Sequence, residues 1–98
     1  MTKNKPTFGF YLMTSKGYEI IKIFHRKFGS EYIAFVISDR DKTLTNDYYS
    51  EIKDFCLGGN IPFYNRTESF NIFSTYNFAI SWRYIIIENE KIIVLHDS

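Results

Sequence analysis

The chain contains three short runs of apolar, strand-forming residues. Between the first run and the second, apolar residues recur at helical spacing. The runs are Phe8–Met13, Tyr32–Ser38 and Ile92–Leu95. An uninterrupted apolar run is typical of a strand buried on both faces, as in a parallel sheet whose crossovers are helices. The alternation therefore predicts an α/β fold, with a mainly parallel open sheet in a three-layered arrangement.

Two helices are expected from the same pattern. One should run from about Ser15 to Phe28, and the second should begin after a cap at Thr45 or Asn46. Cys56 is the single cysteine and falls on the apolar side of the second helix, so a buried structural thiol is expected. His25 lies beside the apolar stripe of the first helix, where it should face solvent or cap the helix.

The rest of the chain completes the predicted sheet. Ile61–Tyr64 is a short strand that lies at an edge or begins at Phe63, because proline cannot join a central ladder. Thr67–Thr75 is expected to be a short helix and Asn77–Trp82 a fourth strand, whereas Tyr84–Ile87 fits either strand or helix. Counted along the chain, the strands should lie in the order 3-2-1-4-5, with the first strand in the middle.

The length and the net charge of the chain limit the number of its domains and the classes of function that it can have. The 98 residues suffice for a single domain, residues 1–98, and a net charge of +1 argues against an electrostatic nucleic-acid binder. No run spans a bilayer and no signal peptide is apparent, so the expected location is cytoplasmic, away from membranes. The end at His96–Ser98 resembles the middle of a loop, which predicts truncation after the fifth strand and possible homo-oligomers through the exposed sheet edge.

Three loops at the carboxyl ends of the strands could hold a ligand, since ligands collect there in open parallel sheets. The first offers hydroxyls, an ammonium and helix amides, which suit an anion or simply cap a helix: Thr14, Ser15, Lys16 and Gly17. The second, Ser81-Trp82-Arg83, offers a flat ring and a charged fork, or covers a sheet edge. Asp39 and Asp41 follow the second strand, as ribose ligands or as parts of a solvated turn.

The third loop contains His96, directly after the fifth strand. A histidine there could donate a proton, accept one or stabilise an oxyanion, and a structural role is the alternative.

Three segments resemble the family of N10-formyltetrahydrofolate-dependent formyltransferases, particularly its sugar-amine and methionyl-tRNA members. Asn60–Tyr64 resembles the family's Asn-Ile-Pro-hydrophobic segment, Ala79–Ile86 its folate-side strand and loop, and Ile92–Ser98 its catalytic strand. The resemblance implies a Rossmann-like formyltransferase N-terminal domain. It also implies N10-formyltetrahydrofolate as cosubstrate and a small-molecule amine, such as an amino-sugar nucleotide, as acceptor.

Residue by residue, the resemblance assigns a catalytic role to His96 and matches Ser98 to the family's following serine. It implies a folate site at Ser81, Trp82, Arg83, Tyr84 and Ile85. The residues that suit an anion by their own chemistry, Thr14, Ser15, Lys16 and Gly17, are expected to bind the substrate.

Two departures weaken the catalytic assignment. Val94 replaces the family's asparagine, so one oxyanion donor is missing, and Asp97 replaces its proline. The family's essential Asp lies further along than Ser98, so this chain is expected to be inactive alone. The alternative is a non-catalytic α/β module for nucleotide binding or dimerisation; a nicotinamide-dependent oxidoreductase fits less well, because Gly17 is the sole glycine of its turn.

Overall fold

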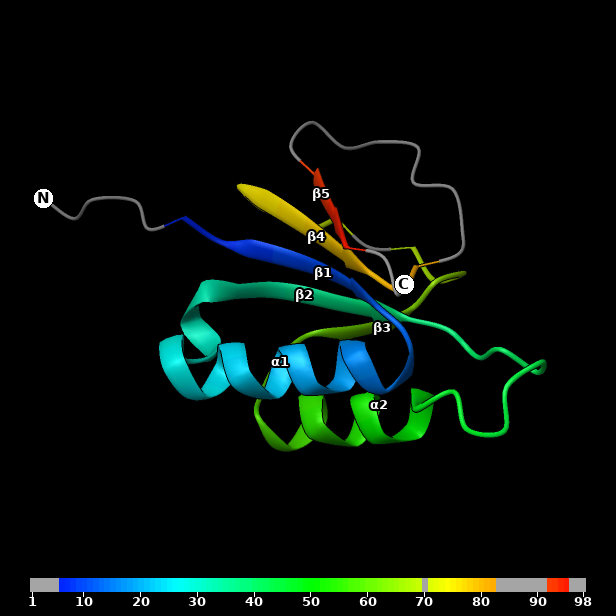
Figure 1. Cartoon of the computed structure of the whole chain (residues 1–98). Helices are drawn as coiled ribbons and strands as arrows, with labels where there is room; N and C mark the ends of the chain where they lie inside the picture. Colours follow the sequence, from blue (N-terminus) through cyan, green and yellow to red (C-terminus); the bar gives the residue numbers. More distant parts are fainter. Residues whose placement is uncertain (1–5, 70, 83–91, 96–98) are drawn as a thin grey trace, which may run out of the picture.

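A computed structural model describes residues 6–69, 71–82 and 92–95 of the chain. Five strands form one sheet in the order β3-β2-β1-β4-β5, and every neighbouring pair is parallel (Figure 1). The strands are β1 Phe8–Leu12, β2 Ile33–Ser38, β3 Phe63–Asn65, β4 Tyr76–Ile80 and β5 Ile92–Leu95. The predicted strand order and direction are thus confirmed.

Two helices, α1 Thr14–Phe28 and α2 Tyr49–Gly58, lie side by side on one face of the sheet (Figure 1). The steps from β1 to β2 and from β2 to β3 move in the same direction, so right-handed crossovers place both helices on that face. Neither helix is long and apolar enough to cross a membrane, as far as the described residues go.

The cap expected for α2 at Thr45 or Asn46 is wrong, because the helix begins later. Tyr48 has a left-handed φ of 63° and ends the loop, and the Asp47 carboxylate accepts the N–H of Tyr49 at 2.9 Å. Asn46 still contributes, since its side-chain oxygen accepts the N–H of Tyr48 at 2.9 Å, but it does so from the loop before the helix.

The helix expected over Thr67–Thr75 is also wrong, since the described part of this segment consists of turns and extended chain. At its start, the Asn65 side chain accepts both the N–H and the hydroxyl of Thr67, at 2.9 and 2.7 Å. At its end, Thr75 donates its N–H to the Thr7 carbonyl at 2.9 Å. These bonds hold the two ends of the segment without a helix. The described residues therefore provide two of the three expected layers, the sheet and the helices on one of its faces.

Apolar side chains fill the space between the sheet and the two helices. The most deeply buried are Phe10, Leu12, Ile21, Val36, Ile52 and Cys56. The Phe10 ring packs between Phe24 and Phe78, with centroids 5.0 and 5.6 Å away. The prediction of a buried Cys56 is confirmed, because α2 turns that residue onto the sheet.

His25, expected to face solvent or to cap the helix, lies in the last turn of α1 and is only partly exposed. Its ring is half-buried and meets the ring of Phe55 edge-on, at a centroid distance of 5.4 Å. The histidine therefore helps to join α1 to α2, which its position beside the apolar stripe of α1 permits.

On the face opposite the helices, Gly9 lets two side chains cross the central strand. A β-carbon at Gly9 would lie 2.7 Å from Cε1 of Phe35 and 2.5 Å from Oδ1 of Asn77. Both neighbours come from the strands that flank β1, in register with Gly9. The absent side chain thus makes room for the ring of Phe35.

Ser38, the last residue of β2, is fully buried, and its hydroxyl has no hydrogen-bond partner among the described residues. A buried polar group left unpaired costs about 1–3 kcal/mol. We therefore expect Ser38→Ala to leave the free energy of unfolding unchanged or to raise it by up to about 1 kcal/mol, as measured by urea denaturation.

Ser74→Ala is the matched control, because the Ser74 hydroxyl bonds to Oδ1 of Asn77 at 2.7 Å. This variant should lose about 1 kcal/mol. If Ser38→Ala loses as much as the control, the Ser38 hydroxyl is satisfied in solution and the prediction is wrong.

Candidate functional site

The carboxyl ends of β1 and β4 meet at the centre of one edge of the sheet. From β1 the chain proceeds outward to β2 and β3, and it then crosses back to β4 on the other side of β1. This reversal is the point at which open α/β sheets form a crevice for ligands. A hydrogen bond of 3.2 Å from the Met13 N–H to the Ile80 carbonyl holds the two strand ends together.

Two hydroxyl residues with left-handed backbone follow these strands. Thr14 has a φ of 66° and Ser81 a φ of 57°. This conformation costs a residue with a β-carbon on the order of 1 kcal/mol, and such strain tends to gather at binding sites. Two strained turns, one from each predicted loop, therefore flank the point where the strand order reverses.

The predicted Thr14–Gly17 loop forms the first turn of α1. Ser15 and Lys16 are exposed, and the Lys16 N–H donates to the Thr14 hydroxyl at 3.3 Å. Gly17 is buried instead, and a β-carbon there would lie 2.9 Å from Cβ of Leu12. Gly17 therefore lets α1 pack closely on the end of β1, while the side chains of Ser15 and Lys16 lie at the surface.

A shallow hollow adjoins this turn. It is lined by Ser15, Lys16, Glu19 and Ile20, and no acidic side chain lies in the first turn of α1. The amide dipoles of a helix N-terminus and the nearby ammonium favour an anionic group at the first turn, whereas the Glu19 carboxylate in the lining disfavours one.

The second predicted loop is described in part. The Trp82 ring meets Tyr11 of β1 edge-on, with centroids 5.4 Å apart and planes at 69°. Ser81 and Trp82 are both half-buried at the carboxyl end of β4. Arg83, Tyr84 and Ile85 lie outside the described residues, as does His96.

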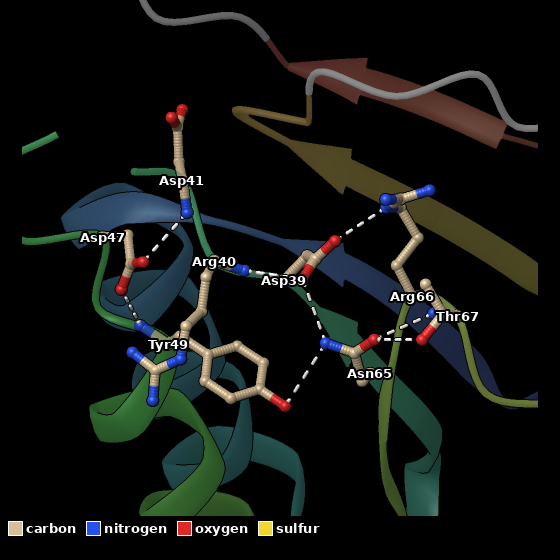
Figure 2. Close-up of polar contacts among 8 residues, drawn as sticks. All are labelled: Asp39, Arg40, Asp41, Asp47, Tyr49, Asn65, Arg66 and Thr67. Carbon is tan, nitrogen blue, oxygen red and sulfur yellow. Dashed lines mark hydrogen bonds and ion pairs between the residues drawn. The ribbon is translucent and has the colours of Figure 1, made fainter. Parts of the chain in front are cut away.

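A polar cluster at the ends of β2 and β3 contains residues that the sequence analysis did not connect. The Asp39 carboxylate accepts Nε of Arg66 at 2.8 Å, Nδ2 of Asn65 at 3.0 Å and its neighbour Arg40's backbone N–H at 2.7 Å (Figure 2). Asn65 also reaches the Tyr49 hydroxyl at 3.4 Å. The sequence signal for this cluster was weak, because it consists of one polar residue at the end of a three-residue strand and one directly after it, Asn65 and Arg66.

The cluster stabilises the ionised form of Asp39. Partial burial would raise the pKa of this carboxyl, but the hydrogen bonds from Arg66, from the Arg40 backbone and from Asn65 outweigh it. The resulting pKa lies below the ordinary value of 3.8. Both oxygens of Asp39 are engaged within the protein, which favours the structural interpretation of this residue over a ribose ligand.

Asp41 stabilises the turn that follows β2. Its Oδ1 accepts the N–H and the hydroxyl of Thr43 at 3.0 and 2.5 Å. Its own N–H donates to the Asp47 carboxylate at 2.9 Å (Figure 2). These bonds close the loop between β2 and α2, which supports the turn alternative for Asp41.

Cys56 is a buried, unreactive thiol in α2, remote from the carboxyl ends of the strands. Burial raises the pKa of its thiol to about 12, so very little thiolate exists near neutral pH. We expect iodoacetamide to alkylate native protein at pH 8 only as fast as the chain opens, and denatured protein at the rate of a free cysteine. Mass spectrometry of timed samples measures both rates; equal rates would contradict the buried thiol.

No protein-family model, curated protein or solved structure matches this chain. The functional argument therefore depends on the residues at the carboxyl edge of the sheet.

Proposed function

We propose that this chain is a formyltransferase-like protein that takes N10-formyltetrahydrofolate and a small amine, such as an amino-sugar nucleotide, at the crevice between β1 and β4. One observation carries the proposal. The parallel order β3-β2-β1-β4-β5 brings the Thr14–Gly17 turn and the Ser81-Trp82 turn together at the reversal point of the sheet. The sequence resemblance assigns the folate to the second of these loops, and the chemistry of its own residues suits the first to an anionic substrate.

The residues present suit the two ligands in different ways. Ser15 and Lys16, at the N-terminus of α1, suit the diphosphate of a nucleotide. Trp82 and Tyr11 offer aromatic rings beside the Ser81 hydroxyl, and the flat pterin of a folate stacks on such rings. The cosubstrate would supply the formyl carbon that the amine attacks.

The described residues would bind and orient both ligands at this crevice. In the proposal, His96 stabilises the negative charge that develops on the formyl oxygen. Val94 cannot assist it as an amide side chain would, so slow transfer is expected at best.

Calorimetry with two ligands tests the proposal. The stable N5-formyl isomer of tetrahydrofolate probes the folate side, and a UDP-linked amino sugar probes the anion side. Lys16→Ala should weaken sugar-nucleotide binding about five- to tenfold through the lost charge and leave folate binding unchanged. Ser81→Gly removes a hydroxyl from the proposed folate side, so it should weaken folate binding and leave nucleotide binding unaffected. The turn itself should keep its shape, because glycine readily adopts the positive φ of this position.

Lys27→Ala is the control, since it removes an exposed lysine from the other end of α1. Binding of the nucleotide without any folate binding would overturn the formyltransferase proposal in favour of a non-catalytic nucleotide-binding module. The turn at Lys16, free of acidic side chains, favours that second candidate. If neither ligand binds, both functions are wrong.

A further inference from the structure

We draw no further inference here: the strongest candidate, the aromatic flank between α1 and β4 on which Phe28 and Tyr76 are exposed, is an apolar surface for which nothing in the structure shows what covers it.

Discussion

Gly9→Ala is expected to lower the free energy of unfolding by about 2–3 kcal/mol, the upper part of the range for overpacked cores. The new methyl group would overlap the ring of Phe35 and the amide oxygen of Asn77. Phe35 is only 3% exposed and also contacts the Tyr11 ring, so it has little room to move away. Urea denaturation monitored by circular dichroism measures the loss.

Gly58→Ala provides a matched control for the same chemical change. Gly58 ends α2, and a β-carbon there would meet nothing within 4 Å. Alanine is the better helix former, so this variant should be neutral or more stable by up to about 1 kcal/mol. Equal losses in the two variants would mean that crowding at Gly9 is not the cause.

A double-mutant cycle then isolates the crowding by Phe35. Phe35→Leu removes the ring atoms that a β-carbon at Gly9 would meet. Its cost should be smaller in the Gly9→Ala background than alone, because it relieves the overlap there. Strictly additive losses would contradict the close approach of Phe35 to β1.

Asp39→Asn is expected to lower the free energy of unfolding by about 1–2 kcal/mol at pH 7. Both carboxylate oxygens of Asp39 accept hydrogen bonds, from charged and neutral donors, whereas an amide has a single accepting oxygen. The side chains of Asp39 and Arg66 are 16% and 40% exposed, so solvent screens the pair in part. Asp54→Asn, on the exposed side of α2, is the matched control and should change stability little.

The effect should depend on pH in a defined direction. The pKa of Asp39 is lowered in the folded protein, so the carboxylate contributes stability above the unfolded pKa near 3.8 and loses it as the pH falls through the folded pKa. The difference between wild type and Asp39→Asn should therefore be full at pH 6–7 and shrink below about pH 4. A difference that stays constant down to pH 2.5 would show that the ionised form of Asp39 is not what stabilises the fold.

The class of fold and most of its elements could be predicted from the amino-acid sequence alone. The apolar runs at Phe8–Met13, Tyr32–Ser38 and Ile92–Leu95 became strands because the residues prefer extended backbone and need burial on two faces. The order of the strands followed from right-handed crossovers and the central place of β1. These properties depend on local propensity and chirality, which each segment carries with it.

Contacts between segments that are distant in the sequence override these local preferences in several places, and only the tertiary structure shows them. The segment expected to be helical at Thr67–Thr75 is instead held by Asn65 at one end and Thr7 at the other. Asp39 gains its partners only because β2 and β3 end side by side, which brings Asn65 and Arg66 to it from 26 and 27 residues away. Gly17 likewise contacts Leu12 because α1 folds back onto β1. The packing of the helix on the strand, and not the sequence of the turn, therefore makes Gly17 a buried residue and leaves Ser15 and Lys16 exposed.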